Sequence, residues 1–547
     1  MRTEALIICA VLAFAGTSHA EKSGDIPLWG RFEAAFTSAK AYDNPLYDVR
    51  RFEAVFTSPS GRSAKRAGFW DGGVSWKVRF MPDEIGTWKY TTSCSDDDNS
   101  GLHDVSGSFE CVPNTSSHDI FSRGRIERPK GEFHLVHADG TPFFWFADTA
   151  WNGPLRSTDD EWALYLDNRA DKGFNVIQFV TTQWRGGDRD ENGRDAFEGS
   201  GYITVDTEYF RRLDNKIDVI NDRGLVAAPV LLWALQRGAG RHLSPGYHLP
   251  HEEAILLAKY MVARYGGHHV VWLLGGDGDF LGEYEQRWKT IGRGVFGSGD
   301  HPGLVTLHPC GRSWYGDAYR DEDWLDIIGY QSSHSTSQGT VEFITKGPAT
   351  NDWANIPPRP LINLEPLYEN IRDEATVRDV RNACWWSILA TPVAGITYGA
   401  NGVWSWLREG ETILNHRHNP QTKIWRASLD FPGVRETAFL ASFMRSFPWW
   451  NLMPAPDLLA DQPGDKDYRR FVSVAATFDK SLVIAYIPDE TTVTLYNTRG
   501  MNYRARWFDP AANSWSSADI TTAGNRMVAE SPAGKDIVLV LEESANP

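Results

Sequence analysis

The sequence predicts a multidomain protein in which a central (β/α)8 TIM barrel is flanked by an N-terminal and a C-terminal β-sandwich domain. Three observations lead to this prediction. A chain of 547 residues is too long for one ordinary core. Both ends contain short alternating runs between turn residues, whereas the middle alternates apolar strands with helical segments. The expected parts are a signal peptide (1–20), a sandwich (24–115), the barrel (118–452) and a second sandwich (453–547).

The N-terminus has the pattern of an export signal. Arg2 precedes an apolar stretch over residues 5–16, and the small residues Ser18 and Ala20 fit cleavage after Ala20. This stretch is too short to span a bilayer, and no later segment is long or apolar enough. We therefore expect a secreted or periplasmic protein without a membrane span.

Charge and aromatic content narrow the classes of partner. The formal net charge of −16 would repel nucleic acid and anionic membrane surfaces, so neither is expected as a partner. The 23 Trp residues favour a carbohydrate partner, because flat aromatic faces stack on the C–H faces of sugar rings. Core packing is the competing explanation for most of them. The oligomeric state stays open.

Residues 24–115 are predicted to be strands. Alternating runs at 31–36 and 75–80 are separated by turns such as Asn44-Pro45 and Asp71-Gly72-Gly73. No amphipathic helix of normal length fits here, so a small β-sandwich is expected.

The cysteines allow two interpretations. Cys94 and Cys111 flank an Asp/Ser/Gly-rich loop, where an exported protein can form a disulfide or keep two thiols. Cys310 and Cys384 are expected to be buried thiols. No CxxC pair and no metal-type Cys/His spacing occurs, so no metal and no cofactor is predicted.

Residues 118–452 alternate predicted strands and helices. The eight expected strands lie at 143–146, 176–180, 226–232, 270–274, 304–307, 327–330, 361–364 and 394–397. One helix is expected to open at Ser157, with Asp160 in the capping-box position. Another carries Phe210 and Leu213 at helical spacing and ends at Gly224. Eight such units within about 300 residues favour a closed parallel barrel over an open sheet.

Residues 453–547 return to alternation. Strands are expected at 471–474, 482–486, 503–508 and 537–540. Turns at Asp509-Pro510 and Pro532-Ala533-Gly534 separate them, so a second sandwich is predicted.

In such a barrel, function belongs at the carboxyl ends of the strands. Nearly every predicted strand carries polar or aromatic groups there. The candidate substrate-binding residues are Asp148, Trp151, Gln183, Trp184, Trp233, His308, Gln331, His334, Asn363, Tyr398, Trp404 and Trp406. The Trp residues are candidate stacking walls, and the His and Asn residues are candidate donors to sugar hydroxyls or to a nucleophile. Core packing is the competing explanation for each.

Two carboxylates follow predicted strands on opposite sides of the barrel mouth. Glycosidic bond cleavage requires a carboxylic acid that protonates the leaving oxygen and a carboxylate across from it. We assign Asp277 as acid/base and Glu365 as nucleophile. The competing explanations are helix capping, or an ion pair with Arg185 or Arg312. Asp279 is the alternative acid.

The acidic segment after the fourth strand also begins like a calcium loop. The pattern fails at Leu281, where a third oxygen ligand should stand. A metal ion is therefore not expected at this loop.

Three segments of the middle region resemble the apiosidase-like barrel domain of glycoside hydrolase family 140 and its relatives. They are Phe144-Trp145-Phe146-Ala147-Asp148-Thr149-Ala150-Trp151, Trp272-Leu273-Leu274-Gly275-Gly276-Asp277 and Asn363-Leu364-Glu365-Pro366-Leu367-Tyr368-Glu369. By this resemblance, Asp277 and Glu365 would act as acid/base and nucleophile in a retaining mechanism. Related retaining barrels usually have Asn-Glu where this chain has Gly276-Asp277.

The outer regions are also similar to known domains. Residues 56–61, 68–73 and 79–88 resemble a sandwich of unknown function that often precedes such barrels. The C-terminal region resembles a sandwich named for collagen binding, a name from which no collagen binding is inferred.

The leading hypothesis is a secreted retaining glycoside hydrolase that cleaves a plant, algal or microbial polysaccharide or oligosaccharide. One alternative is a polysaccharide lyase, in which Arg185 or Arg312 would neutralise a uronic acid. The other is a non-catalytic carbohydrate-binding surface protein. The sugar, the linkage and endo or exo action are not encoded in a readable motif.

Overall fold

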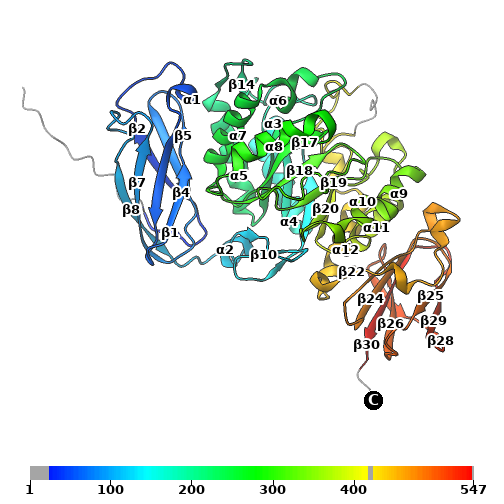
Figure 1. Ribbon diagram of the computed structural model, residues 1–547. Coiled ribbons are helices and arrows are strands. Elements are labelled where there is room, and N and C mark those ends of the chain that lie inside the picture. The colour runs from blue at the N-terminus through cyan, green and yellow to red at the C-terminus, as the bar shows by residue number, and fades with distance from the viewer. Residues whose placement is uncertain (1–23, 417–422, 545–547) are drawn as a thin grey trace, which may run out of the picture.

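The computed structural model describes residues 24–416 and 423–544, so the predicted signal peptide lies outside the described residues. Two strand-rich regions enclose a region in which strands and helices alternate (Figure 1). Each strand-rich region has its own cluster of buried apolar side chains, and a larger cluster fills the middle region. The predicted multidomain organisation is thus present.

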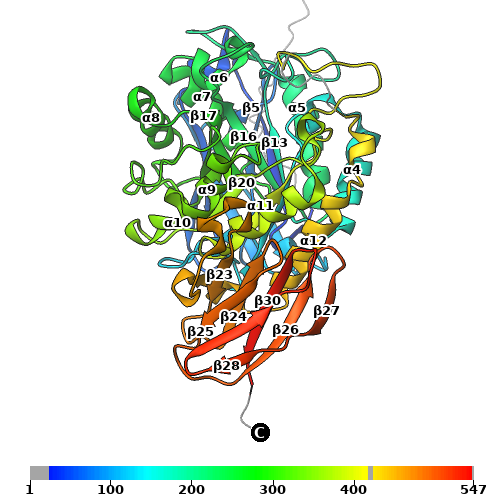
Figure 2. The ribbon, with the colours of Figure 1, turned by 90° about the vertical axis from the view of Figure 1, so that its right-hand side faces the viewer.

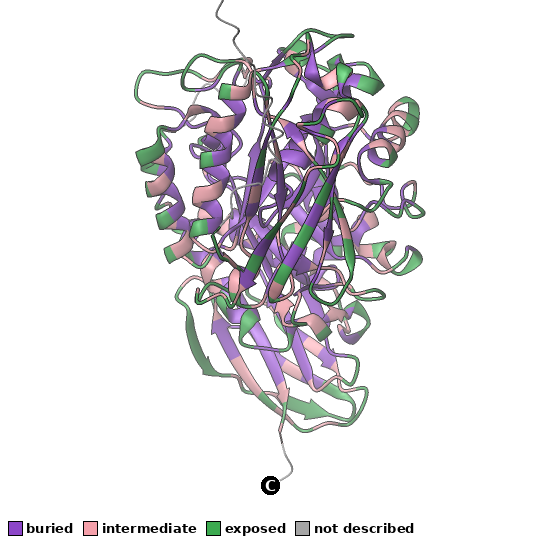
Figure 3. Cartoon of the chain, turned by 90° about the vertical axis from the view of Figure 1, so that its left-hand side faces the viewer, coloured by how far each residue is buried: buried purple, intermediate pink, exposed green. Residues whose placement is uncertain are grey.

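The N-terminal region contains two sheets, in the strand orders β1-β8-β7-β3-β4 and β2-β6-β5. Their strands are β1 (Ile26–Pro27), β2 (Phe32–Thr37), β3 (Phe52–Thr57), β4 (Ser63–Ala67), β5 (Phe69–Trp70), β6 (Ser75–Phe80), β7 (Gly86–Cys94) and β8 (Ser106–Val112). Buried and exposed residues alternate along β2 and β7, as expected for strands with one face on a core (Figure 3). Helix α1 (Pro45–Asp48) makes a single turn.

Cys94 and Cys111 are buried free thiols, which resolves the alternative left open by the sequence. Antiparallel β7 and β8 place Cys111 opposite Gly86, at the far end of β7 from Cys94. At 3.3 Å per residue, about 26 Å of strand separates Gly86 from Cys94. A disulfide requires Cα atoms within about 7 Å.

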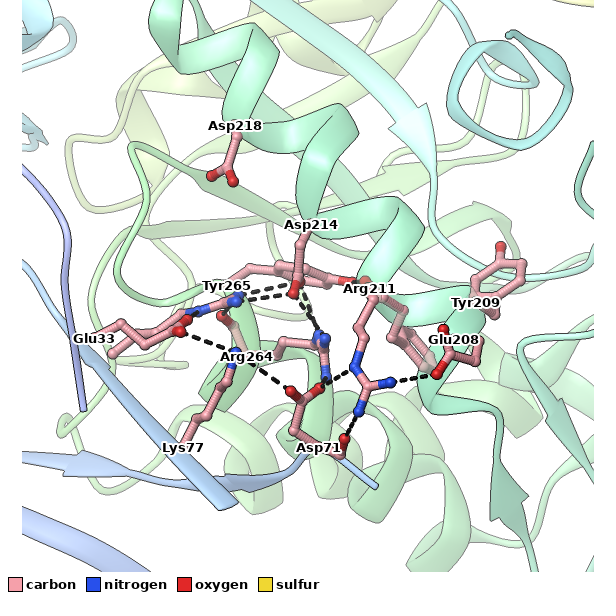
Figure 4. A network of polar contacts seen from close by, with 12 residues as sticks. Glu33, Asp71, Lys77, Glu208, Tyr209, Arg211, Asp214, Asp218, Arg264 and Tyr265 are labelled. Carbon is pink, nitrogen blue, oxygen red and sulfur yellow. Dashed lines mark hydrogen bonds and ion pairs between the residues drawn. The ribbon is translucent and has the colours of Figure 1, made fainter. Parts of the chain in front are cut away.

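Buried charges join the N-terminal region to the helices of the middle region (Figure 4). Asp214 of α5 (Thr207–Asp222) accepts two hydrogen bonds from Arg79, at 3.0 and 2.8 Å. It accepts two more from Arg264 of α7 (His251–Tyr265), both at 2.7 Å. Burial alone would raise the pKa of Asp214, but the two guanidinium groups hold it below its ordinary value.

The middle region contains eight parallel strands. They are β12 (Trp145–Thr149), β13 (Val176–Val180), β16 (Val226–Trp233), β17 (Val271–Gly278), β18 (Leu304–Pro309), β19 (Ile328–Gln331), β20 (Leu361–Glu365) and β21 (Gly395–Tyr398). Six of them form one sheet in the order β18-β17-β16-β13-β12-β21, and β19 pairs with β20 in a second sheet. The first strand, β12, therefore pairs with both the second and the last.

Two isolated parallel bridges lie where the two sheets adjoin. Thr306 of β18 pairs with Ile327, directly before β19. Glu369 and Ala400 pair beyond the ends of β20 and β21. All eight strands consist of buried residues, apart from partly buried positions in β17 and β18. Such strands fit the continuous apolar runs read from the sequence.

Helices cover the outer side of these strands, and the longer ones are α4 (Asp159–Asp171), α5, α7, α8 (Glu285–Phe296), α9 (Gln338–Lys346), α11 (Val377–Leu389) and α12 (Pro432–Arg445). Helix α4 begins one residue later than predicted, because Thr158 and Glu161 form the capping box in place of Ser157 and Asp160. Shorter elements between them are α2 (Asp119–Ser122), α3 (Gly153–Arg156), α6 (Pro245–His248) and α10 (Pro348–Asn351).

The first parallel strand also starts later than predicted. Pro142–Phe143 forms a separate strand, β11, which pairs with β10 (Leu135–His137) in a small antiparallel sheet with β9 (Ile126–Glu127). Strand β12 therefore runs from Trp145 to Thr149 and contains Asp148 within it.

The C-terminal region again contains two sheets, in the orders β22-β23-β24-β30-β26-β27 and β25-β29-β28. The strands are β22 (Met453–Pro454), β23 (Ser473–Ala476), β24 (Leu482–Ile487), β25 (Thr492–Tyr496), β26 (Tyr503–Asp509), β27 (Ser514–Ser517), β28 (Thr521–Ala523), β29 (Arg526–Glu530) and β30 (Ile537–Glu543). This region lies against α11 and α12 (Figure 2).

Aromatic and charged contacts hold the C-terminal region to α11. Trp385 stacks on Tyr486, with ring centroids 5.5 Å apart. Arg381 hydrogen-bonds to Asp536 of the sandwich side at 2.6 and 2.5 Å and also pairs with Glu436 of α12. Over residues 24–416 and 423–544, no helix combines the length and the hydropathy that a membrane crossing requires.

Candidate active site

A cavity of about 330 Å³ opens at the carboxyl ends of the parallel strands. Trp233, Gln331 and Glu365 are the last residues of β16, β19 and β20, and Asp277 lies one residue before the end of β17. All four line the cavity. The two carboxylates predicted to carry the chemistry thus share one enclosed space.

Glu365 is nearly fully buried and surrounded by donors. Gln331 Nε2 donates to Glu365 Oε2 at 2.6 Å, and His334 Nε2 lies 3.0 Å from Oε1. His308 Nε2 lies 2.9 Å from Oε2. Burial alone would raise the pKa of Glu365, but the contacts from His308 and His334 outweigh it and hold this pKa far below its ordinary value.

Asp277 lies in a distorted part of β17. Its φ of +52° is in the left-handed region, and the pairing with β18 shifts register on both sides of Gly276. Burial and the negative charge of Glu365 raise the pKa of Asp277, and the positive charge of Arg185 offsets this in part. Two carboxylates in one cavity therefore have pKa values displaced in opposite directions.

His308 contacts both carboxylate residues. Its Nδ1 accepts a hydrogen bond from the backbone N–H of Asp277 at 3.3 Å. Because Nδ1 is the acceptor, the ring proton belongs to Nε2, which faces Glu365. Cys310 Sγ donates to the carbonyl oxygen of Asp277 at 3.0 Å. Side chains of the β18 end thus fix the backbone of Asp277 on both sides.

The glycine before Asp277 makes room for an aromatic wall. A Cβ atom at Gly276 would lie 2.7 Å from Val230 and 2.8 Å from the Trp233 ring. Trp184 packs on Trp233 with ring centroids 4.4 Å apart, and Trp151 lies 6.0 Å from Trp233. These rings expose at most 3% of their surface, so they form fixed walls.

The structure brings nine of the predicted site residues together. Those that line the cavity are Trp151, Trp184, Trp233, Asp277, Gln331, His334, Glu365 and Trp404. His308 lies directly behind them, in contact with Glu365. Asp279, the alternative acid, does not line the cavity, and its carbonyl oxygen accepts a hydrogen bond from Gln236.

Asp148, predicted to bind substrate, is instead part of the core. It is fully buried and forms an ion pair of 2.6 Å with Arg169, and the Tyr165 hydroxyl donates to it at 2.7 Å. The reason is its position inside β12 with its side chain turned toward α4. Its carboxylate is therefore used in packing.

Four further predicted binding residues also lie outside the cavity. Gln183 Nε2 donates to the Phe197 carbonyl at 2.7 Å, and Asn363 Nδ2 donates to Ser332 and Ser387 at 3.0 Å. The remaining two are Tyr398, which donates to Glu369, and Trp406, which stacks on Trp425 at 4.5 Å. The polar groups of Gln183, Asn363 and Tyr398 are thus engaged by other parts of the fold, and the Trp406 ring packs on Trp425.

Several lining residues were missed from the sequence: Gly311, Ser333, Tyr368, Ile371, Arg372, Asn415 and His416. Arg185, named in the lyase alternative, also lines the cavity. One of the missed residues had a signal, because Tyr368 follows Glu365 by three residues. Tyr368 accepts a hydrogen bond from Trp151 Nε1 at 2.7 Å. Among the described residues, neither Arg185 nor Arg372 forms an ion pair.

The part of the chain that the structure describes contains no group of three or more His, Cys, Asp or Glu residues arranged to hold a metal ion. The titratable and charged side chains that line the cavity include two carboxylates, two imidazoles and two guanidinium groups: Asp277, Glu365, His334, His416, Arg185 and Arg372. Two carboxyl groups with pKa values shifted in opposite directions form an arrangement suited to acid-assisted displacement.

Comparisons with known proteins agree with this geometry. Residues 129–451, more than half of the chain, match the family described as "Apiosidase-like, catalytic domain". Residues 25–95 match a domain of unknown function, DUF5060, and residues 453–542 match the "Putative collagen-binding domain of a collagenase". No curated protein matches the chain.

Solved structures share the fold. A structure entitled "Glycoside hydrolase" is 22% identical with a TM-score of 0.67, covering 79% of this chain and 100% of that one. A glycoside hydrolase family 5 protein from Bacteroides vulgatus is 22% identical (TM-score 0.66; 78% and 94% covered). A "putative glycoside hydrolase" from the same organism is 18% identical (TM-score 0.71; 95% and 100% covered). The chain therefore belongs to the apiosidase-like catalytic-domain family and is a glycoside hydrolase.

Proposed function

We propose that this protein is an exported retaining glycosidase that cleaves a glycosidic bond in a polysaccharide or oligosaccharide. Asp277 would be the acid/base and Glu365 the nucleophile. The observation that carries the proposal is that both carboxylates line one cavity, in which Gln331 and His334 contact Glu365. The pKa values of the two carboxyl groups are shifted in opposite directions, which agrees with these roles. Such a pair supplies a proton donor and an anion at the same pH.

In the first step, protonated Asp277 donates its proton to the glycosidic oxygen while Glu365 attacks the anomeric carbon. The bond between that carbon and the leaving oxygen breaks, and a glycosyl ester of Glu365 forms. Gln331 and His334 hold the two Glu365 oxygens in place before attack. His308 contacts Glu365 through Nε2 and the backbone N–H of Asp277 through Nδ1, so it supports both residues.

In the second step, ionised Asp277 takes a proton from water, whose oxygen attacks the same carbon and releases Glu365. Two inversions at one carbon give net retention. Trp151, Trp184, Trp233 and Trp404 bound the cavity and limit the water that reaches the ester.

We also propose that the eight parallel strands form one closed (β/α)8 barrel, with sandwiches at residues 24–115 and 453–547 and the barrel at 118–452. The pairing of β12 with β21 and the bridges Thr306–Ile327 and Glu369–Ala400 support closure. The pattern of residues 1–20 supports export.

A polysaccharide lyase is a second candidate, because Arg185 and Arg372 line the cavity without a carboxylate partner among the described residues. A lyase would remove a proton next to a uronate carboxylate and leave a double bond in the product. Product analysis separates the two reactions, since hydrolysis adds water and creates no double bond.

The direct test is hydrolysis of a panel of polysaccharides and oligosaccharides by the wild type beside Asp277→Asn and Glu365→Gln. We expect turnover of one glycan to fall by about 10²–10⁴-fold in Asp277→Asn, and at least as far in Glu365→Gln. Asp279→Asn is the matched control, because Asp279 lies two residues away but outside the cavity. Full activity in both folded variants, or an inverted product anomer by NMR, would overturn the assignment.

The pH profile gives a second test. Activity requires ionised Glu365 and protonated Asp277, so it falls as pH rises through the raised pKa of Asp277. In acid it persists until the lowered pKa of Glu365 is reached. His334→Ala removes one contact that lowers this pKa, so the acid limb of kcat/KM should move to higher pH. An unmoved acid limb would contradict the role given to His334.

A further inference from the structure

A second cavity, of about 480 Å³, lies beside the active site. Its walls come from the loop after β19, from α9 and α11, and from loops of the C-terminal region at residues 467–470 and 488–489. Figure 2 shows α9 and α11 next to the C-terminal strands. Its volume is within the range of cavities that bind small ligands.

The loop after β19 lies between the two cavities and lines both. Gln331, the last residue of β19, and His334 of this loop contact Glu365 in the first cavity. Ser335 and Thr336, from the same loop, line the second cavity. Ser333 lines both, so the two cavities border the same residue. A ligand that extends from Glu365 over Ser333 would reach the second cavity.

The polar groups of the second cavity are balanced in charge. Three guanidinium groups and three carboxylates line it: Arg378, Arg469, Arg470, Asp379, Asp467 and Asp489. Such a lining favours a ligand with many hydroxyl groups and no net charge, because each hydroxyl can both donate and accept.

Two side chains of this cavity have hydrogen-bond donors that are not used within the described structure. Arg469 of the C-terminal region is exposed, lies over the Tyr468 ring at 5.2 Å and forms no ion pair among the described residues. Asn382 of α11 uses its Oδ1 to accept from Tyr486, which leaves its Nδ2 for another acceptor. The donors come from both regions, so a ligand here would touch the barrel region and the sandwich together.

We propose that this second cavity binds a further, uncharged sugar unit of the substrate, so that the C-terminal sandwich takes part in substrate binding. The proposal rests on the glycosidase function and adds that the substrate extends beyond the bond that is cut. Arg469 is its specificity-determining residue on the sandwich side.

The test measures binding without cleavage, by calorimetry on Glu365→Gln protein. The probes are neutral cello-, xylo-, manno- and arabino-oligosaccharides, each from the disaccharide to the hexasaccharide. We expect affinity for one series to rise with length. Adding Arg469→Ala should weaken binding of the hexasaccharide about tenfold, the size of one lost charged hydrogen bond, and leave the disaccharide unchanged.

Two further variants distinguish loss of the binding site from loss of folding. Thr336→Trp should block the cavity sterically without removing a partner, because Thr336 is exposed. Arg504→Ala, an exposed arginine of β26 in the same sandwich, is the matched control and should bind like the parent. A length gain that survives both Arg469→Ala and Thr336→Trp, or no length gain in any series, would overturn the proposal.

These outcomes are distinct from failure of the proposed function. If the wild type hydrolyses no glycan but length-dependent binding through Arg469 persists, the glycosidase mechanism fails and the second subsite stands. If the wild type hydrolyses a glycan without a contribution from Arg469, the mechanism stands and the second subsite fails.

Discussion

The two strand-rich end regions are attached to the middle region in different ways. At the N-terminal junction, buried Asp214 lies between Arg79 and Arg264. At the C-terminal junction, apolar side chains of the sandwich belong to the hydrophobic cluster of the middle region itself: Ala475, Leu482, Ile484, Tyr486, Phe508, Val538 and Val540. Among the described residues, the N-terminal region contributes Phe69 to that cluster.

This difference determines what happens when each junction opens. Charged groups at a separated surface regain hydration from water, whereas an exposed apolar face promotes association. The C-terminal region is therefore an extension of the central core. The N-terminal region has its own core and is joined to the middle region by buried ion pairs and by fewer apolar contacts, those of Leu46, Tyr47, Phe69 and Trp70. A sandwich fixed in this way can also contribute side chains to a binding cavity at a constant position.

Deleting one end region at a time should give the largest difference between the two junctions, measured as the solubility of the truncated protein. Removal of residues 24–115 leaves Asp214 paired with Arg264 in water, so we expect a soluble, folded and less stable protein. Removal of residues 453–544 uncovers Trp385 and the apolar face of α11, so we expect aggregation. Soluble yield and gel filtration of both truncations measure this. A soluble C-terminal truncation beside an insoluble N-terminal one would reverse the comparison.

Neither junction could be predicted from the sequence, although most strands could. Buried strands can be predicted from continuous runs of mostly apolar residues. The strand predicted at 176–180 has the same limits as β13. Asp214 gives no such signal, because one Asp on an amphipathic helix is the pattern of a solvated face. Its partners Arg79 and Arg264 lie far along the chain, and only the tertiary structure brings them together.

The site shows the same division. Glu365 and Asp277 could be placed in one cavity from the sequence because carboxyl ends of parallel strands converge at one rim. The direction of the Asp148 side chain could not be predicted, because only the tertiary structure places Arg169 of α4 beside it. His416 and Asn415 enter the cavity from a long loop, where no periodicity constrains position.

Asp214→Ala should give the next largest effect. It removes the carboxylate that two buried guanidinium groups share, although Arg79 keeps Glu33 and Arg264 keeps Asp71 as partners. Removing one partner of a buried ion pair costs about 3–5 kcal/mol. Denaturant unfolding followed by Trp fluorescence measures the loss. Asp430→Ala is the control, because its ion pair with Lys172 is exposed and should cost under about 1 kcal/mol. Equal losses of unfolding free energy in the two variants would mean that the buried charges of the N-terminal junction contribute no more than an exposed ion pair.

The smallest effect concerns the sign of the pH dependence at the two junctions. The pKa of Asp214 is lowered on folding, so its stabilisation is full above its ordinary value of 3.8 and is lost as pH falls through the lowered one. Glu436, beside Arg381, has the opposite shift, because burial raises its pKa above 4.5 and Arg381 offsets only part. The folded protein therefore holds this proton more tightly, and stability falls as pH rises from 4.5 through the raised pKa.

Glu436→Gln should abolish this second dependence, while Arg381 keeps Asp536 as its partner. The fall in unfolding free energy between mildly acidic and neutral pH should become shallower than in the wild type, and the loss in strong acid should stay as it is. Denaturant midpoints across this pH range measure both slopes in one series. A wild-type slope in the Glu436→Gln protein would mean that Glu436 is not the group that sets this pH dependence at the C-terminal junction.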